Sequence, residues 1–442
     1  MIEITDYVNV KEEIPYEIQR DSILNIITNN VTSYTHGFHK YPAKFIPHIP
    51  RWAINKYLSK RKNQTVLDPF CGSGTTLAEG MLAGHNVIGI DIDPLSSLIS
   101  KVKITIIDIS KLNQITDWLA KKIKKRKRGK FKPECETIKH WFDRDTIEKL
   151  SVIRSTIDEI PDKFGRSKKI KDIQELLFIC FSSILRRTSR ADNESQKAYV
   201  SHTKTKIPEE PLYLFLSQLN FFKTRIKEYS KLVDTKLKSR ILCTTSTESL
   251  QTILKSKHID LVITSPPYIK AIDYIYNQMV ELFWIGDLFG LQTQTKQNRK
   301  KGIYIGTKHI YKKEFSDYTP FNTPIGIKKL DEKIKEVFTT DKKNGHKHAY
   351  ITFKYFADME KHFKEISRCL EKGTHYILVV GNSSVSDILF ATSDFLISII
   401  ERNGFKLMNK WRYKIKNRYM RFDRKGRGGI IKYDWVLDLI KI

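Results

Sequence analysis

Cysteine is scarce in this chain, and the few cysteines have no spacing that suits a metal site or a disulfide framework. The five cysteines are odd in number and widely scattered, and no C-x-x-C pair occurs, which argues against both. Long apolar runs are also lacking, because none approaches the roughly 18 residues of a membrane span. The first residues carry acids and no apolar stretch, so no signal peptide is expected. We therefore expect a cytoplasmic protein with no metal site and no membrane partner.

Acidic residues are outnumbered by basic ones. Lys and Arg total 78 against 49 Asp and Glu, which leaves a net charge of +29. Basic surface attracts phosphate polyanions and releases their counterions, so this composition favours a nucleic-acid partner. Residues 121–132 concentrate the charge, with Lys or Arg at nine of twelve positions, and residues 410–419 interleave basic and aromatic side chains. A lysine-rich solvated surface is the alternative interpretation of the same charge.

Strand and helix signals divide the chain into an α/β part and a helical part. A strand at 64–67, a glycine-rich turn, a helix that ends at Gly84 and a strand at 86–91 together predict a βαβ unit. Between residues 111 and 238, apolar residues recur at helical spacing and strand signals are sparse. This pattern predicts a large α-helical insertion.

The α/β pattern resumes after the insertion. Strands are expected at 241–244, 260–264 and 376–381, a helix at 386–403, and an antiparallel pair across 406–440. The polar, basic and turn-rich stretch between the second and third of these strands predicts a long irregular excursion. The chain is thereby divided into five parts: 1–110, 111–238, 239–290, 291–347 and 348–442.

The turn after the first strand of the βαβ unit reads DPFCGSGT over residues 68–75. Gly72 and Gly74 let the backbone approach a ligand closely, because no Cβ is in the way. Asp91 ends the next strand, 19 residues beyond Gly72, a spacing at which a carboxylate accepts both hydroxyls of a ribose. NAD would require a third glycine where Leu77 stands, and a phosphate-binding Walker loop is absent. S-adenosyl-L-methionine needs neither feature. We expect a nucleoside cofactor here, with a plain structural turn as the alternative.

A second turn, Ser265-Pro266-Pro267-Tyr268, follows the strand that ends near Ile263. Two prolines cannot continue a strand, so a rigid turn is expected at the strand's carboxyl end, where α/β sheets place their ligands. The Ser265 hydroxyl and the Pro266 carbonyl can accept the two N–H bonds of an exocyclic amine on cytosine or adenine. This would free the nitrogen lone pair for reaction. Tyr268 would stack on the base, a contact worth about 1–3 kcal/mol. An ordinary turn is the alternative interpretation.

Both turns resemble motifs of a known family, the amino-methylating DNA methyltransferases of restriction–modification systems. Residues 68–75 are similar to the cofactor motif, 265–268 to the catalytic motif, and 36–45 to the element that closes over the methionine end of S-adenosyl-L-methionine. The resemblance implies a Rossmann-like class I methyltransferase sheet of seven strands with a reversed last hairpin. It also implies S-adenosyl-L-methionine as cofactor, a base flipped out of double-stranded DNA, and a cognate restriction endonuclease as a partner.

The choice of base rests on the first position of the second motif. Ser265 is similar to the cytosine-N4 members, whereas adenine-N6 members more often have aspartate there. The cytosine-C5 branch needs a Pro-Cys nucleophile, and no Pro-Cys dipeptide occurs in the chain. We expect a cytosine-N4 DNA methyltransferase. The alternatives are an adenine-N6 DNA methyltransferase, a methyltransferase of RNA base amines and a non-catalytic DNA-binding protein.

The resemblance assigns roles to the parts of the chain and to individual residues. Residues 1–110 and 239–290 would form the cofactor-binding and catalytic halves, and 348–442 the rest of the sheet. Target recognition would come from 111–238 or 291–347. The expected catalytic residues are Ser265, Pro266, Pro267 and Tyr268. The expected cofactor-binding residues are Tyr41, Pro42, Lys44, Asp68, Phe70, Cys71, Gly72, Ser73, Gly74, Thr75, Asp91, Ile92 and Ser246, the last where the family often has an acid for the adenine ring.

Overall fold

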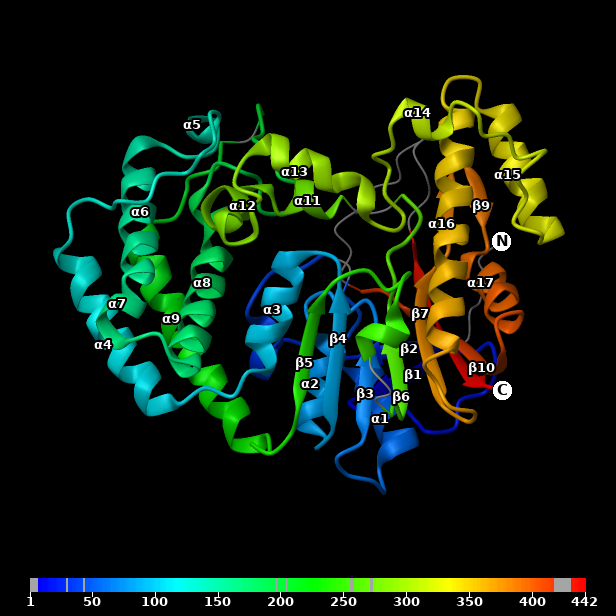
Figure 1. Ribbon diagram of the computed structural model, residues 1–442, viewed down its shortest axis with the longest axis horizontal. Helices are drawn as coiled ribbons and strands as arrows, with labels where there is room; N and C mark the ends of the chain where they lie inside the picture. The colour runs from blue at the N-terminus through cyan, green and yellow to red at the C-terminus, as the bar shows by residue number, and fades with distance from the viewer. Residues whose placement is uncertain are drawn as a thin grey trace.

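The computed structural model describes residues 7–28, 31–42, 44–195, 197–203, 205–254, 258–270, 273–416 and 431–442. A central sheet lies between a helical region on one side and a smaller group of helices on the other (Figure 1). No helix in the described ranges has the length and apolar character needed to cross a membrane.

The central sheet has nine strands within the described ranges, in the order β1-β2-β10-β11-β7-β6-β3-β4-β5. Its strands are β1 (Tyr7–Lys11), β2 (Ile23–Ile27), β3 (Thr65–Asp68), β4 (Asn86–Asp91), β5 (Ser239–Cys243), β6 (Leu261–Thr264), β7 (His375–Gly381), β10 (Phe405–Lys414) and β11 (Tyr433–Lys441). The strands from β5 to β7 are mutually parallel, and β11 runs antiparallel between β7 and β10. The run from β5 to β10 is therefore the expected Rossmann-like sheet with a reversed last hairpin. The turn expected at 424–429 lies outside the described residues.

Two further strands extend this sheet beyond the expected seven. β2 pairs in parallel with β10 through Ile23 and Arg412, and β1 pairs in parallel with β2. Both strands have only five residues, and β10, with which β2 pairs, lies nearly the whole chain away. Pairing of this kind has no local sequence signature, so these strands were not predicted.

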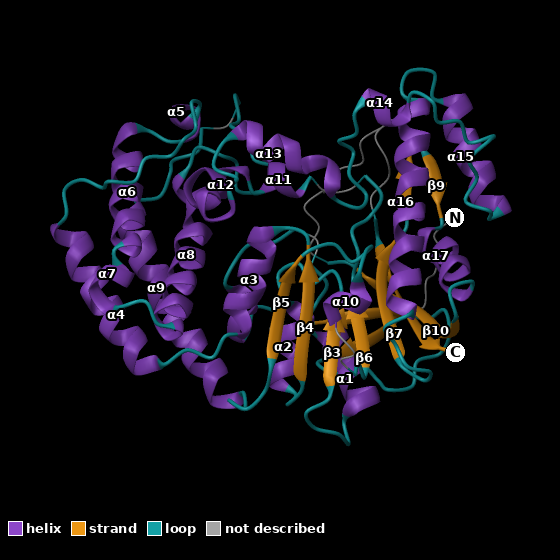
Figure 2. Ribbon diagram, viewed as in Figure 1, coloured by secondary structure: helices purple, strands orange, loops and turns teal. Residues whose placement is uncertain are grey.

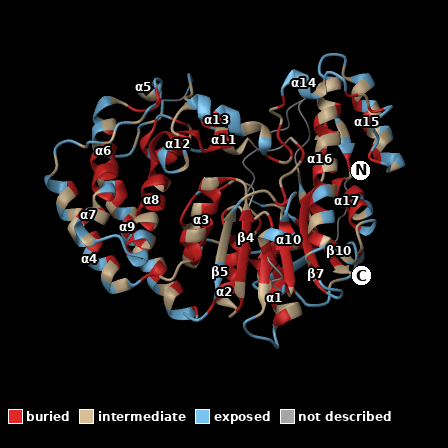
Figure 3. Ribbon diagram, viewed as in Figure 1, coloured by how far each residue is buried: buried red, intermediate tan, exposed pale blue. Residues whose placement is uncertain are grey.

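Alternating side chains of the strands build a separate core on each face of the sheet. Val66 packs on one face with α1 (His48–Leu58) and α2 (Thr75–Leu82), whereas Leu67 packs on the other. The second face is covered by α10 (Leu250–Leu254), α16 (Gly345–Ser367) and α17 (Thr392–Glu401), and α15 (Lys328–Thr340) packs against α16. Figures 2 and 3 show the orange strands as mostly buried between these helices. This two-residue alternation is the mark of a sheet covered on both sides.

The segment between β4 and β5 is helical. Its helices are α3 (Pro94–Ile104), α4 (Ile109–Lys125), α5 (Ile138–Trp141), α6 (Arg144–Asp158), α7 (Ile160–Phe164), α8 (Lys168–Thr188) and α9 (Pro211–Leu232). They share a third core with α12 (Met279–Ile285), which comes from the part of the chain after β6. The basic stretch 121–132 is partly fixed here, because the backbone N–H groups of Lys130 and Phe131 each donate to Ser155 Oγ at 2.8 Å.

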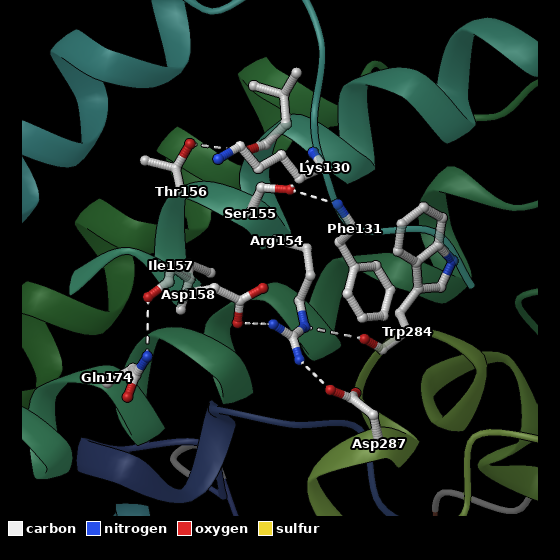
Figure 4. Close-up of polar contacts among 11 residues, drawn as sticks. Lys130, Phe131, Arg154, Ser155, Thr156, Ile157, Asp158, Gln174, Trp284 and Asp287 are labelled. Atoms are coloured by element: carbon white, nitrogen blue, oxygen red, sulfur yellow. Dashed lines mark hydrogen bonds and ion pairs between the residues drawn. The ribbon is translucent and has the colours of Figure 1, made fainter. Parts of the chain in front are cut away.

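One buried arginine fastens this helical segment to the turn after α12, η2 (Gly286–Phe289) (Figure 4). The Arg154 guanidinium lies between the rings of Phe131 and Phe178, 4.4 and 4.6 Å from their centroids. Its nitrogens donate to the carboxylates of Asp158 and Asp287 and to the backbone carbonyl of Trp284. Every guanidinium nitrogen thus has an acceptor, as a buried charge requires.

Two sequence-based expectations are wrong. The supposedly irregular stretch 291–347 contains α13 (Gln294–Lys300), α14 (Lys312–Phe315) and α15. Short amphipathic repeats hide among its turn residues: Leu330, Ile334 and Val337 are buried at helical spacing. The helix expected at 386–403 begins only at Thr392, because residues 386 and 387 have positive φ and turn the chain between β8 (Ser383–Val385) and β9 (Ile388–Phe390).

Candidate active site

The glycine-rich turn and the Ser-Pro-Pro-Tyr turn follow the carboxyl ends of two neighbouring strands. β3 and β6 are paired in parallel through Val66 and Leu261. From β3 the chain proceeds to β4 and β5 on one side, and from β6 it proceeds to β7 on the other. The gap between β3 and β6 is therefore the point where the strand order reverses, and α/β sheets bind ligands at this point.

A buried hydrogen bond joins the two turns at their base. The Thr264 hydroxyl, at the end of β6, donates to Asp68 Oδ1 at 2.6 Å, and the Phe70 N–H donates to the same oxygen at 3.1 Å. Burial raises the pKa of Asp68 to about 6. Asp68, expected to bind cofactor, thus supports both turns from beneath and does not line the cavity described next.

Both turns open onto one cavity. The expected site residues that line it are Tyr41, Lys44, Phe70, Cys71, Gly72, Ser73, Thr75, Asp91, Ile92, Ser246, Ser265 and Pro267. The expected residues that do not line it are Pro42, Asp68, Gly74, Pro266 and Tyr268. The structure therefore brings residues from the two motifs, and from the segment 36–45, to one cavity.

Gly72 has a conformation that only glycine adopts easily. Its φ is +48°, and a Cβ at this position would lie 3.1 Å from Cε1 of Tyr41. The Gly72 N–H donates to Asp91 Oδ2, and the Asp93 N–H donates to Asp91 Oδ1, both at 2.8 Å. Burial, aided by the neighbouring Asp93 charge, raises the pKa of Asp91 to about 7. The carboxylate thus holds the turn while each of its oxygens keeps a lone pair for a ligand.

Two hydroxyls on the cavity wall are buried without a partner. Ser73 Oγ and Ser246 Oγ form no hydrogen bond within the described part of the chain, although both side chains are almost fully buried. Buried polar atoms are nearly always satisfied in native proteins. Their position on the lining of a cavity indicates that a bound molecule supplies the missing partner.

Tyr268 is held from behind by the last strand of the sheet. Its hydroxyl donates to Asp434 Oδ1 at 2.7 Å, and Tyr413 donates to the other carboxylate oxygen at 3.1 Å. A Cβ on Gly381 would lie 3.0 Å from the Tyr268 ring. Burial and the Asp434 charge raise the pKa of Tyr268 well above its usual value, so the phenol stays protonated and keeps donating.

Several cavity residues were missed by the sequence-based reasoning. Tyr274 and Tyr304 stack with ring centroids 5.8 Å apart, and the Tyr304 hydroxyl donates to Asp93 Oδ2 at 2.8 Å. Tyr304 and its neighbours come from the stretch expected to be irregular, which closes one side of the cavity. The other missed lining residues are Phe45, Pro69, Thr244, Thr245, Ile303 and Ile305. Phe45, Pro69 and Thr245 adjoin predicted residues, so the sequence motifs pointed to them. The other missed residues reach the cavity only through the fold.

The segment 36–45 reaches the cavity through two side chains. The Tyr41 hydroxyl is 2.9 Å from Ser96 Oγ, and Lys44 Nζ donates to the His36 carbonyl at 3.0 Å. Burial lowers the pKa of Lys44 to about 8. The segment is anchored by Glu79 of α2, which accepts from both His36 and Arg51. Residue 43 lies outside the described residues.

Comparisons with known proteins agree with this arrangement. A DNA methylase family model matches residues 8–101. The chain is 26% identical to Type II methyltransferase M.MvaI of Kocuria varians over 424 residues, which cover 90% of this chain and 87% of that protein. It is 26% identical to Type II methyltransferase M.MjaII of Methanocaldococcus jannaschii, over 58% of this chain and 47% of that protein. It is 27% identical to Type II methyltransferase M.BsoBI of Geobacillus stearothermophilus, over 58% and 54% respectively.

The sheet order, the two facing turns and these matches agree with one another. Residues 8–101 thus match a DNA methylase family, and the chain is similar over most of its length to a type II methyltransferase. These matches support a methyltransferase of DNA that uses S-adenosyl-L-methionine.

Proposed function

We propose that this chain methylates the N4 amine of a cytosine flipped out of duplex DNA. One observation carries the proposal: Ser265 opens onto the same cavity as Gly72 and Asp91. A donor held by the glycine turn and a base held at Ser265 would therefore meet in one enclosed space, which is the requirement for direct transfer.

The cofactor side of the cavity fits S-adenosyl-L-methionine. Asp91 offers a lone pair on each oxygen to the ribose hydroxyls, and the unsatisfied hydroxyls of Ser73 and Ser246 offer hydrogen bonds to polar groups of the ligand. The aromatic rings of Tyr41, Tyr274 and Tyr304 supply an apolar wall. When bound, the cofactor supplies a methyl group on a positively charged sulfur.

The substrate side would prepare the amine for reaction. In this proposal the Ser265 hydroxyl and the Pro266 carbonyl accept the amine's two N–H bonds, which makes the nitrogen pyramidal and its lone pair available. The prolines fix these acceptors before the base arrives. Tyr268 would stack on the base, and its hydrogen bond to Asp434 would hold the ring in place. Stacking worth about 1–3 kcal/mol offsets much of the cost of extruding the base.

Cytosine is proposed over adenine because Ser265 stands at the first position of the motif. The helical segment 111–238 and the stretch 291–347 are proposed to read the DNA sequence. The first lies beside the sheet, and α13 and α14 of the second lie above the carboxyl ends of its strands (Figure 1), where residues 303–305 line the cavity. We further propose that the chain works in the cytoplasm with a cognate restriction endonuclease, as the type II names of its relatives suggest.

The test uses duplex DNA and S-adenosyl-L-methionine with a labelled methyl group, followed by nuclease digestion and mass spectrometry. The expected product is N4-methylcytosine. The variant Ser265→Ala with Tyr268→Ala is expected to lose at least 100-fold in rate, as removal of one preorganised acceptor or donor commonly does, while calorimetry shows cofactor binding retained. Ser398→Ala on α17, outside the cavity lining, is the control. If the product were N6-methyladenine, the target base would be adenine. If only RNA were labelled, the substrate would be RNA. An unaltered rate in the double variant would reject the roles assigned to Ser265 and Tyr268.

A further inference from the structure

A second hollow of about 550 Å³ begins two residues after Tyr268. Its wall includes Lys270, Lys308, Lys347 and His348, and no carboxylate is among the residues that line it. We call these four residues the basic pocket. Its position ties it to the Ser-Pro-Pro-Tyr turn, because Lys270 belongs to the same loop.

The basic pocket is built, with side chains held in place. Lys270 Nζ donates to His348 Nε2 at 2.8 Å, and the Lys270 N–H donates to the Gly306 carbonyl at 3.0 Å. On the other side of its ring, His348 Nδ1 lies 3.0 Å from Asp341 Oδ2, and Ser386 donates to the same oxygen at 2.6 Å. The histidine therefore accepts from Lys270 as a neutral ring and directs the ammonium into the hollow.

The pocket carries more positive than negative charge. Lys308 and Lys347 form no ion pair with any carboxylate in the described part of the chain. Asp273, the nearest other acid on this loop, is already paired with His309. Burial lowers the pKa of Lys270, the Asp341 charge opposes this shift, and the like charges of Lys308 and Lys347 add a smaller lowering. An anion in the hollow would relieve this repulsion.

A long helix adds to the same field. Asn344, Lys347 and His348 lie at the start of α16, which runs for 23 residues from Gly345. The N-terminus of such a helix carries about half a positive charge, and Asp341 already meets part of it by accepting from the N–H groups of Asn344 and Gly345. Lysine ammoniums and a helix start that point to one hollow form an anion site of the kind that binds phosphate groups.

We propose that the basic pocket binds a backbone phosphate of the DNA strand that carries the target base. The inference rests on the proposed function and adds a second point of attachment to it. A flipped base keeps its phosphates, and the pocket starts five residues after Ser265 in the same loop. Holding the phosphate would fix the sugar while Ser265 and Tyr268 receive the base, which restricts the extruded nucleotide to one orientation.

The experiment measures DNA affinity as a function of salt for Lys308→Ala with Lys347→Ala. Neither lysine has a carboxylate partner to strand, so the fold should tolerate the change. Loss of one phosphate contact is expected to lower affinity about tenfold near 50 mM salt and to reduce the slope of log K against log salt by about 0.9. The matched control is Lys372→Ala with Lys406→Ala, which removes the same charge from exposed positions just before β7 and at the start of β10, at the opposite edge of the sheet. An equal loss in both double variants would overturn the proposal.

A chemical variant of the DNA locates the contact. In a duplex carrying the mapped target, one phosphate beside the target base is replaced by an uncharged methylphosphonate. The unaltered protein should lose about tenfold in affinity on this duplex, and the Lys308→Ala, Lys347→Ala protein should lose nothing more. If the protein variant and the modified duplex each lowered the affinity independently, so that the two fold-losses multiplied, the basic pocket would not be the site of this phosphate. Failure of the proposed function is seen separately, as absence of methyl transfer by the unaltered protein. If the two substitutions weakened binding of free inorganic phosphate but not of DNA, the pocket would be a site for small anions only.

Discussion

One buried charge of the helical segment and the polar groups of the cavity wall differ in whether the chain itself satisfies them. In the helical segment, each nitrogen of Arg154 has an acceptor from the chain itself (Figure 4). In the cavity, Ser73 and Ser246 have buried hydroxyls without partners, and the pKa of Asp91 is raised. Satisfied groups hold a fold together, whereas unsatisfied ones on a cavity wall await a ligand. The difference separates the Arg154 cluster, which supports the fold, from the cavity wall.

The largest expected effect is on stability and comes from replacing Arg154, whose nitrogens all have acceptors within the chain. Arg154→Met leaves two acidic side chains and a carbonyl without their donor. Breaking a buried ion pair costs about 3–5 kcal/mol, and we expect about 3 kcal/mol here because both carboxylates remain partly hydrated. Urea unfolding measures the loss. The control is Arg166→Met at an exposed position, which should change the free energy of unfolding by no more than about 0.5 kcal/mol. A loss of cofactor affinity in folded Arg154→Met would contradict a purely supporting role for Arg154.

The next effect is a pH dependence at Asp91. Its carboxylate must be ionised to accept two ribose hydroxyls, and the pKa is about 7. Cofactor affinity should therefore rise up to tenfold per pH unit below pH 7 and level off above it, as calorimetry from pH 5.5 to 8.5 will show. In Asp91→Asn the affinity should be lower and flat with pH.

The stability of the ligand-free protein should change with pH in the opposite sense. The folded pKa of Asp91 lies above the usual value of about 3.9, so the folded state binds the proton more tightly than the unfolded state does. This contribution to stability is fully present below about pH 4 and is lost as the pH rises through about 7. A cofactor affinity that falls as the pH rises would refute ribose binding by an ionised Asp91.

The smallest expected effect comes from comparing two buried serines, one without a hydrogen-bond partner and one with a partner. Ser246→Ala should weaken cofactor binding about threefold, the worth of one hydrogen bond of roughly 0.7 kcal/mol, with no loss of thermal stability, because the hydroxyl has no partner to lose. Ser96→Ala is the matched case, since its hydroxyl donates to Asp93 at 2.8 Å. It should cost about 1 kcal/mol of stability. A similar stability loss in both would mean that Ser246 is a structural serine.

Local signals were enough to predict the reacting turns but not the wall around them. The strand, glycine turn and helix at 65–82 form from neighbouring residues, and so does the Ser-Pro-Pro-Tyr turn, so the sequence pattern sufficed. Tyr304 reaches the cavity from a stretch whose turn residues obscured its helices. The bond between Tyr268 and Asp434 joins residues 166 positions apart. Contacts of this range depend on the order of strands in the sheet, which no short motif encodes.

The hydrogen bond between Thr264 and Asp68 has a consequence for how such an enzyme can diversify. It ties the two turns to strands that lie about 4.8 Å apart, so in the proposed function the span that the methyl group must cross is fixed by the regular spacing of the sheet. Outlying helices can then be exchanged, lengthened or retuned toward new DNA sequences while the gap between donor and acceptor stays the same.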